Sequence, residues 1–344
     1  MAFVSNRHRD PGVEFVQPGP GAFAFHRAHP AYEPGALVEI ASPRPDLYRL
    51  FAKDERNRLG LPAFKILGAS WAIESVADPT ITELTAATDG NHGRAVARVA
   101  RDRGLAATIF VPTVIDPEKI EAIASEGATV IQLDDDYDAA VAAAARHGEQ
   151  PGVLLVQDTA WPGYTDIPSR IVDGSSTIFA VLDEQLAEAL ERPDDHPIIV
   201  LAPNGVGSLA QAATVAAQHY GWAVLIVDPT EAACGAESLA AGAPVTVPAS
   251  ETIMAGLNCP TLSSLAWPVL AAGCHGAITV TDDDAREAMR YLADRGIPTG
   301  PTGSATTASL PQLPHAFTDG ELGKHLAARP GEAVVITLLT EAAY

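Results

Sequence analysis

Lys65 is the first residue in the sequence that suggests chemistry. It lies in a segment, residues 61–70, whose other side chains are all apolar or small. Such surroundings remove water from an ammonium group and favour the neutral amine, which can attack a carbonyl carbon. The alternative is a structural lysine whose stem packs on the core while its charged head reaches solvent. The segment by itself favours this structural role, so a catalytic role must be supported by other residues.

Two aspartates follow predicted strands and could act as proton acceptors. Asp89 comes after a predicted strand at 84–87, and Asp158 comes after one at 153–157. Parallel strands end at one edge of a sheet, where open α/β sheets bind ligands, and two carboxylates there can divide acid and base work. The structural alternatives are helix capping by Asp89 or Asn91, and a turn in which Asp158 bonds its own backbone.

A glycine-rich turn could bind a phosphate group. Residues 204–208 read Asn-Gly-Val-Gly-Ser and lie between a predicted strand at 198–202 and a predicted helix at 208–220. Glycines allow backbone N–H groups to converge, and a helix N-terminus favours an anion. The turn lacks the Gly-Lys-Ser/Thr of a P-loop and the longer dinucleotide fingerprint. A tight turn without a ligand is therefore the alternative.

The elements that must position these residues are short apolar strands alternating with helices. This alternation predicts an α/β fold of two open parallel-sheet lobes, with the active site between them. We expect residues 1–70 and 172–344 to form a large domain and residues 71–171 to form a small one.

Three parts of the chain depart from this regular alternation. The Pro- and Gly-rich N-terminal arm is predicted to hold edge strands at 13–16 and 36–40. Residues 46–57 are predicted to be helical. Residues 161–176, again rich in Pro and Gly, are expected to be irregular chain that crosses from one lobe to the other.

The composition excludes several classes of partner. With 22 Lys and Arg against 43 Asp and Glu, the net charge is −21, which argues against nucleic acid or an anionic membrane surface. No stretch approaches the roughly 20 apolar residues of a transmembrane helix, and no apolar run of a signal peptide follows Arg7 and Arg9. We therefore expect a cytoplasmic protein. The three cysteines show no CxxC spacing, so no metal site is expected.

Five segments taken together resemble a known family. They are Pro-Ala-Phe-Lys at 62–65, Thr-Asp-Gly-Asn-His-Gly-Arg at 88–94, Gln-Asp-Thr-Ala-Trp-Pro-Gly-Tyr-Thr-Asp-Ile-Pro at 157–168, Gly-Val-Gly at 205–207 and Ile-Met-Ala-Gly-Leu at 253–257. In this order they closely resemble the diaminopropionate ammonia-lyases, which are fold-type II (tryptophan synthase β-like) enzymes that use pyridoxal 5'-phosphate. The resemblance runs from about residue 60 to the last predicted strand, and its most family-specific part is the stretch at 157–168.

The resemblance implies a role for each candidate residue. Lys65 would carry the cofactor as a Schiff base, and Asn91 would contact its phenolic oxygen. Asp89 and Asp158 would remove the α-proton from the two substrate enantiomers. Thr340, after the last predicted strand, would face the pyridine nitrogen. The cofactor phosphate would be held by the glycine-rich turn through Gly205, Val206, Gly207, Ser208 and Leu209.

The implied reaction is α,β-elimination of 2,3-diaminopropionate (D, L or both) to pyruvate and ammonia, by a homodimer. Two departures leave the substrate open. The chain between Lys65 and Asp89 is shorter than the family pattern, and Gly-Pro-Thr-Gly-Ser at 300–304 lacks the glutamate of the family motif. The alternatives are β-elimination or β-replacement on another β-substituted amino acid, as in serine or threonine dehydration, and a non-catalytic protein.

The resemblance also bears on two cysteines. The family can form a disulfide between two loops near the active-site entrance, at positions that match Cys234 and Cys259. A cytoplasmic protein ordinarily keeps its thiols reduced. A disulfide between Cys234 and Cys259 and two reduced thiols are therefore both possible outcomes from the sequence.

Overall fold

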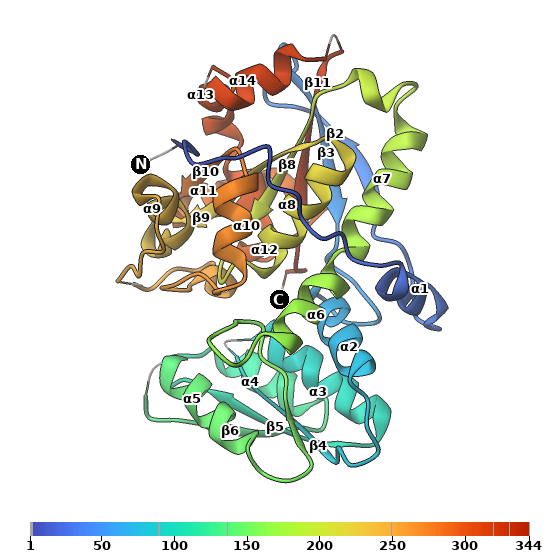
Figure 1. Cartoon of the computed structure of the whole chain (residues 1–344), viewed down its shortest axis with the longest axis vertical. Coiled ribbons are helices and arrows are strands. Elements are labelled where there is room, and N and C mark those ends of the chain that lie inside the picture. Colours follow the sequence, from blue (N-terminus) through green and yellow to red (C-terminus); the bar gives the residue numbers. More distant parts are fainter. Residues whose placement is uncertain are drawn as a thin grey trace.

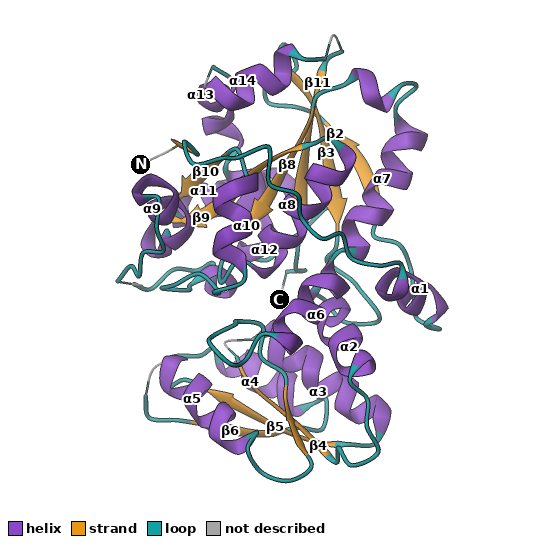
Figure 2. Ribbon diagram, in the orientation of Figure 1, coloured by secondary structure: helices purple, strands orange, loops and turns teal. Residues whose placement is uncertain are grey.

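A computed structural model describes residues 3–88, 90–135, 137–248, 250–318, 320–329 and 331–343. Figure 1 shows two lobes arranged along the longest axis, and Figure 2 shows a sheet in each lobe with helices packed against it. The prediction of an α/β fold with two open-sheet lobes is confirmed. The domain boundaries at 70/71 and 171/172 stay a prediction.

The larger lobe is built on a seven-stranded sheet in the order β1-β10-β9-β8-β11-β3-β2. Its five central strands are parallel, whereas β1 and β2 run antiparallel at the two edges. Antiparallel edge strands are common additions to parallel sheets. The strands are β1 (Phe3–Ser5), β2 (Leu37–Ile40), β3 (Tyr48–Asp54), β8 (Ile198–Pro203), β9 (Ala223–Pro229), β10 (Gly276–Val280) and β11 (Ala333–Leu339).

Helices cover both faces of the larger sheet, and each face has its own hydrophobic core. One core takes side chains from α7 (Thr177–Ala189), α8 (Ser208–Tyr220), α9 (Cys234–Ala241) and α10 (Ala266–Gly273). The other takes side chains from α11 (Asp282–Ala293), α12 (Pro301–Ala308), α13 (Leu313–Phe317) and α14 (Gly320–Ala327). The N-terminal segment crosses the outside of this lobe to reach α1 (Gly21–Ala28), as Figure 1 shows.

The smaller lobe has a four-stranded, fully parallel sheet in the order β6-β5-β4-β7. The sequence predicts strands at 84–87, 107–111, 129–133 and 153–157 and helices at 117–126 and 137–147, all within two residues of the observed bounds. It also predicts a helix after residue 93 that ends near 103, and the observed helix begins three residues earlier. The observed strands and helices follow the predicted order. They are β4 (Glu83–Ala87), α3 (Asn91–Arg103), β5 (Ala106–Val111), α4 (Pro117–Ala124), β6 (Thr129–Gln132), α5 (Tyr137–His147) and β7 (Val153–Leu155).

The predicted helix at 46–57 is wrong, because this segment contains strand β3. The strand pairs with β11 on one side and β2 on the other. Its charged Lys53 is wholly buried, where it donates hydrogen bonds to Gly35 O and to Gln185 Oε1 at 2.8 Å. Partners far away in sequence therefore stabilise a strand whose charges are atypical of a buried position.

Two other expectations fail. Residues 13–16 form no strand, although β2 confirms the prediction at 36–40. Residues 161–176 were expected to be irregular but contain helix α6 (Asp166–Ser175). Its Pro168 lies in the first turn, where a backbone N–H has no helical partner to lose, so the proline does not prevent the helix.

Helix α6 packs closely against α2 (Lys65–Ser75), the helix that begins at Lys65. Two glycines permit the approach. A Cβ atom at Gly174 would lie 2.5 Å from Leu67 O, and one at Gly68 would lie 2.8 Å from Ile171 Cγ2. This crossing fixes the start of α2, and therefore Lys65, at the junction of the lobes.

We predict that Gly174→Ala destabilises the protein by about 1–3 kcal/mol, because the added methyl group has no room at the crossing. The control is Gly323→Ala, in helix α14. A Cβ atom there would lie 3.5 Å from Phe317 O, an ordinary contact, so this variant should be as stable as the wild type or more stable. Urea-induced unfolding followed by circular dichroism measures both variants. Equal stability of Gly174→Ala and the wild type would contradict the close packing of α2 and α6.

Candidate active site

A pocket lies between the two lobes, and residues selected from the sequence line it. Lys65, Asn91 and Asp158 face the turn at 205–209 and Thr340 across the pocket. Asp89 lies outside the described residues. Cys259, selected for a possible disulfide, also lines the pocket. The sequence analysis gave no individual role to the other lining residues, which are Phe64, Thr88, His92, Lys119, Tyr137, Pro203, Gly256, Leu257, Asn258, Thr302 and Glu341.

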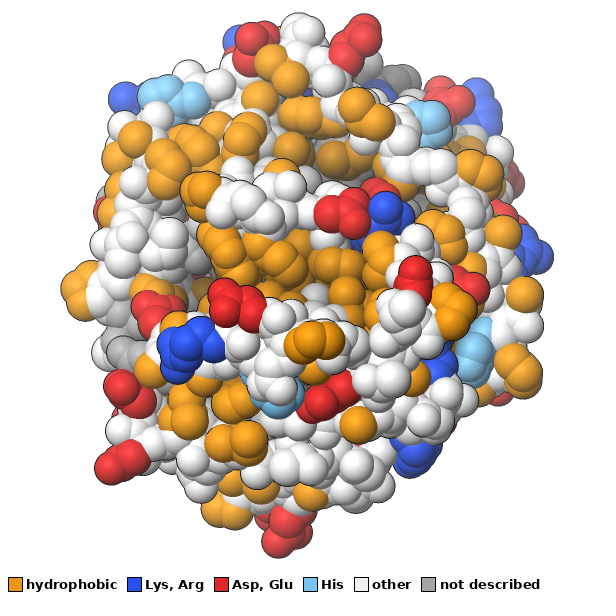
Figure 3. All heavy atoms as spheres, turned by 60° about the horizontal axis from the view of Figure 1, so that its bottom comes forward, with side chains coloured by type: hydrophobic (Ala, Val, Ile, Leu, Met, Phe, Trp, Pro, Cys, Tyr) orange, Lys and Arg blue, Asp and Glu red, His pale blue; other side chains and the backbone are white. Residues whose placement is uncertain are grey.

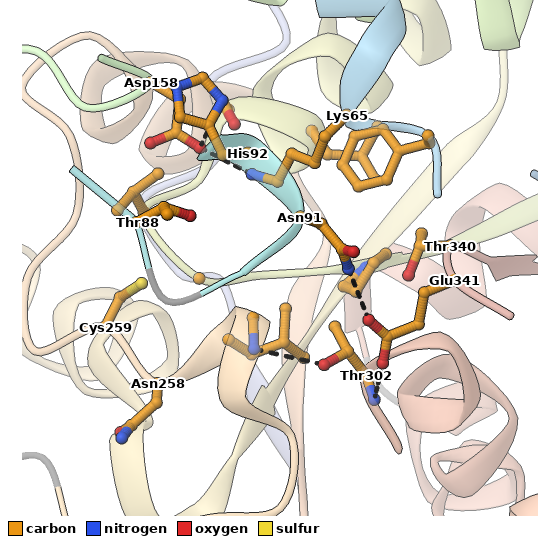
Figure 4. A pocket seen from close by; sticks show the side chains of 18 of the residues that line it. Lys65, Thr88, Asn91, His92, Asp158, Asn258, Cys259, Thr302, Thr340 and Glu341 are labelled. Atoms are coloured by element: carbon orange, nitrogen blue, oxygen red, sulfur yellow. Dashed lines mark hydrogen bonds and ion pairs between the residues drawn. The ribbon is translucent and has the colours of Figure 1, made fainter. Parts of the chain in front are cut away.

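Lys65 forms an ion pair with Asp158. Its Nζ donates a hydrogen bond to Asp158 Oδ2 at 2.7 Å, and Figure 4 shows the two side chains pointing toward each other. Burial would raise the pKa of Asp158, but the positive charges of Lys65 and His92 outweigh it and lower that pKa to about 2. Asp158 is therefore a carboxylate at any ordinary pH, placed to exchange a proton with the lysine amine.

Asp158 is held in place by the segment that follows β7. The Tyr164 hydroxyl accepts a hydrogen bond from Gln157 N and donates one to Leu155 O, each at 2.9 Å. Ala160 N donates to Ser263 Oγ of the larger lobe at 3.0 Å. The stretch that was most specific to the family thus forms a fixed loop that spans the lobes beside the pocket.

His92 lies near the same oxygen of Asp158 that accepts the hydrogen bond from Lys65. Its Nε2 lies 2.7 Å from Val156 O, and a carbonyl oxygen can only accept, so this nitrogen carries a proton. Its Nδ1 lies 4.0 Å from Asp158 Oδ2. In the sequence, His92 could be noticed in the Asn-His pair that lies between a predicted strand and a predicted helix. The sequence could not show that Val156 O and Asp158 would be its neighbours.

The glycine-rich turn leads directly into helix α8, so the helix N-terminus points into the pocket. Gly207 has φ +98°, and a Cβ atom there would lie 2.6 Å from Ala266 Cβ. A Cβ atom at Gly205 would lie 3.1 Å from Gly256 O. Only glycine suits these positions, and the bare backbone leaves a cradle of N–H groups that fits a phosphate.

Thr340 completes the set on the far side of the pocket. It is 2% exposed, and its Oγ1 has no hydrogen-bond partner among the described residues. A buried hydroxyl without a partner is costly, so it fits a ligand atom that can hydrogen-bond to it. A lysine amine, a phosphate cradle and this hydroxyl around one pocket fit the three parts of pyridoxal phosphate.

A family model described as pyridoxal-phosphate dependent enzyme matches residues 31–338. The chain belongs to this family. It is 32% identical to the diaminopropionate ammonia-lyase of Escherichia coli (strain K12), over 92% of this chain and 86% of that protein. It is 34% identical to the diaminopropionate ammonia-lyase of Salmonella typhimurium, over 80% of this chain and 75% of that protein.

Solved structures agree with these relatives. A crystal structure of the Escherichia coli enzyme in complex with an aminoacrylate-PLP azomethine reaction intermediate matches with a TM-score of 0.86 and 29% identity, covering 99% of this chain and 93% of that one. The resemblance to the diaminopropionate ammonia-lyases is therefore confirmed, as are the fold-type II class and pyridoxal 5'-phosphate as the cofactor.

Asn91 lies at the start of α3 and reaches across the pocket of this pyridoxal-phosphate enzyme. Its Nδ2 donates a hydrogen bond to Glu341 Oε2 at 2.7 Å. Glu341 was not selected from the sequence, although an acid directly after Thr340 and the last predicted strand was a signal for it. The roles assigned to the individual site residues remain predictions.

Cys234 and Cys259 are not joined by a disulfide in the structure. Cys234 Sγ donates to Gly205 O at 3.6 Å, and Cys259 Sγ lies 3.2 Å from the position a Cβ atom would take at Gly205. Burial raises the pKa of Cys234, and it raises the pKa of Cys274 to about 12. Buried thiols that stay protonated react slowly.

The face of the molecule drawn in Figure 3 carries charged side chains of both signs. On the face shown in Figure 3, Lys and Arg side chains are scattered singly among acidic ones. Within the described part of the chain, no helix has the length and apolar character needed to cross a bilayer.

We predict that the native protein, prepared without reductant, reacts slowly with Ellman's reagent at Cys234 and Cys274, because both are buried and protonated. After denaturation, three thiols per chain should react, since all three cysteines are free. One reactive thiol after denaturation, with a Cys234–Cys259 peptide in non-reducing mapping, would instead establish the bridge.

Proposed function

We propose that this protein eliminates ammonia from 2,3-diaminopropionate and forms pyruvate. Written in full, one diaminopropionate and one water give one pyruvate and two ammonia. The observation that carries the proposal is the Lys65–Asp158 pair, 2.7 Å apart, in a pocket that also presents a phosphate cradle and a buried hydroxyl. The relatives of 32% and 34% identity, both diaminopropionate ammonia-lyases, support the choice of substrate.

The chain's own residues divide the work of the elimination. The turn at 205–209 would hold the cofactor phosphate by its N–H groups, Lys65 would hold the cofactor carbonyl, and Thr340 would be the partner of the ring nitrogen. When bound, the cofactor draws off the electron pair that is left when the α-carbon loses its proton. A neutral hydroxyl at Thr340 does not supply a proton to the ring nitrogen as an acid would, which favours prompt departure of the β-substituent.

Asp158 is placed to take the α-proton from one substrate enantiomer, because it is buried, ionised and next to Lys65. Asp89 would take it from the other enantiomer, as the resemblance to the family implies. The β-carbon–nitrogen bond then breaks, and the departing amine leaves as ammonia after it receives a proton from Lys65 or from the second aspartate. Water hydrolyses the released unsaturated amine to pyruvate and the second ammonia.

The alternative substrates are tested by the same assay. We expect pyruvate from D-, L- or both forms of 2,3-diaminopropionate, with two ammonia per pyruvate, and turnover at least about 100-fold slower with D- and L-serine and threonine. One ammonia per pyruvate, with serine as the better substrate, would identify a dehydratase. Lys65→Ala should abolish the activity; full turnover by that variant would contradict the proposed chemistry.

We predict that Asp158→Asn lowers kcat about 10²–10⁴-fold for one enantiomer of diaminopropionate and much less for the other, because it removes only one of two bases. Asp166→Asn, a change of the same kind at an aspartate whose side chain is 68% exposed, is the control and should leave both rates unchanged. Pyruvate release measured separately with each enantiomer checks the prediction. An equal loss with both enantiomers would contradict the assignment.

We also propose a homodimer in the cytoplasm. The dimer is carried over from the family. The location agrees with the absence of disulfides among the described cysteines, as is usual in a reducing compartment.

A further inference from the structure

Glu341 is a buried carboxylate of the pocket that the proposed reaction does not use. It follows Thr340 directly after β11, and 5% of its surface is exposed. Figure 4 shows its two oxygens directed to different partners, Asn91 and the first turn of α12. A carboxylate so far from solvent is tolerated when its oxygens are hydrogen-bonded, and both of these are.

The two partners of Glu341 come from different lobes. Its Oε2 accepts the hydrogen bond from Asn91 Nδ2 at 2.7 Å, on α3 of the smaller lobe. Its Oε1 accepts a hydrogen bond from the backbone N–H of Thr302 at 3.0 Å, at the N-terminus of α12 in the larger lobe. An anion is favoured at a helix N-terminus, and hydrogen bonds to a charged group are the stronger kind. One side chain therefore joins the lobes across the pocket.

The start of α12, residues 300–304, packs closely around this carboxylate. A Cβ atom at Gly300 would lie 2.5 Å from Glu341 Oε1, and one at Gly303 would lie 2.6 Å from Glu341 O. Either side chain would displace the glutamate. The turn that lacks an acid of its own thus receives one from the end of β11.

The contact also determines how the Asn91 amide is turned. An ionised carboxylate can only accept hydrogen bonds, so it pairs with the amide nitrogen and not with the amide oxygen. Without it, the amide could rotate by half a turn at little cost. We propose that Glu341 is a positioning residue, which holds the Asn91 amide so that an N–H group, and not Oδ1, is offered to the phenolic oxygen of the cofactor.

The ionisation of Glu341 supports this role. Burial raises its pKa, while the charge of Lys119 on α4 and the hydrogen bonds from Asn91 and Thr302 oppose the rise. As the pH falls through the raised pKa, one oxygen gains a proton and the group can no longer accept from both N–H donors. The positioning effect is therefore present above the raised pKa and is lost as the pH falls through it.

The test is the affinity of the apoprotein for pyridoxal 5'-phosphate, measured by titrating the visible absorbance without any substrate. Glu341→Gln keeps the size and shape of the side chain. Its NH₂ group, however, would face one of the two N–H donors, Asn91 Nδ2 or Thr302 N. We expect a dissociation constant about 10- to 100-fold higher and a shifted visible band, because a charge-assisted hydrogen bond is lost. The difference from the wild type should shrink as the pH is lowered.

Two comparisons separate positioning from a merely structural effect. Glu332→Gln, at an exposed glutamate outside this pocket, should bind the cofactor like the wild type. In an Asn91→Ala background, Glu341→Gln should raise the dissociation constant by less than about threefold, since neighbours that act as a unit are not additive. If Glu341→Gln fails to fold, Glu341→Asp replaces it and should keep the acid-side dependence with intermediate affinity.

The inference rests on the proposed function through the cofactor role of Asn91 alone. Cofactor affinity and a visible band unchanged by Glu341→Gln, or an equal loss with and without Asn91, would overturn it. Failure of the wild type to bind pyridoxal phosphate at all would instead overturn the proposed function. If the wild type binds the cofactor but does not turn over diaminopropionate, the proposed reaction is wrong and the positioning role of Glu341 is unaffected.

Discussion

The pocket depends on one constraint, which is that the carboxyl ends of strands from two separate sheets face each other across a single gap. Asp158 follows β7 and Asn91 follows β4 in the smaller lobe, while the glycine-rich turn follows β8 and Thr340 follows β11 in the larger one. Strand ends are where parallel sheets present helix N-termini and unpaired polar groups. The close crossing of α2 and α6 holds Lys65, the first residue of α2, at this gap.

Two buried carboxylates in this gap are adapted to different tasks by their surroundings. Lys65 and His92 lower the pKa of Asp158 to about 2 against the effect of burial, so this carboxyl group is ionised at neutral pH beside the lysine amine. For Glu341 burial prevails over its neutral donors and the charge of Lys119, so its pKa is raised. Environments that push the pKa values of two acids apart assign them separate roles. In a protein of net charge −21, this local pairing matters more than the overall charge.

Much of the fold could be predicted from the sequence, because its strands and helices follow local patterns. In the smaller lobe the alternation of apolar runs with alanine-rich helices placed every strand and helix between residues 83 and 155. Prediction failed where distant partners override local preference. Strand β3 is stabilised by β11 from the far end of the chain and by a buried site for Lys53, and α6 tolerates Pro168 and Gly174 because it packs against α2.

By itself the sequence determined the kinds of groups that meet in the pocket. A lysine in an apolar segment, a glycine-rich turn before a helix and acids after strands can all be recognised locally, because each depends on its immediate neighbours. Only the tertiary structure decided their partners. The segment around Lys65 alone favoured a lysine that reaches solvent, and the sequence did not show that Asp158, 93 residues away, would lie at its amine. Asn91 and Glu341 are 250 residues apart in the sequence, and they are neighbours because the two lobes pack against each other.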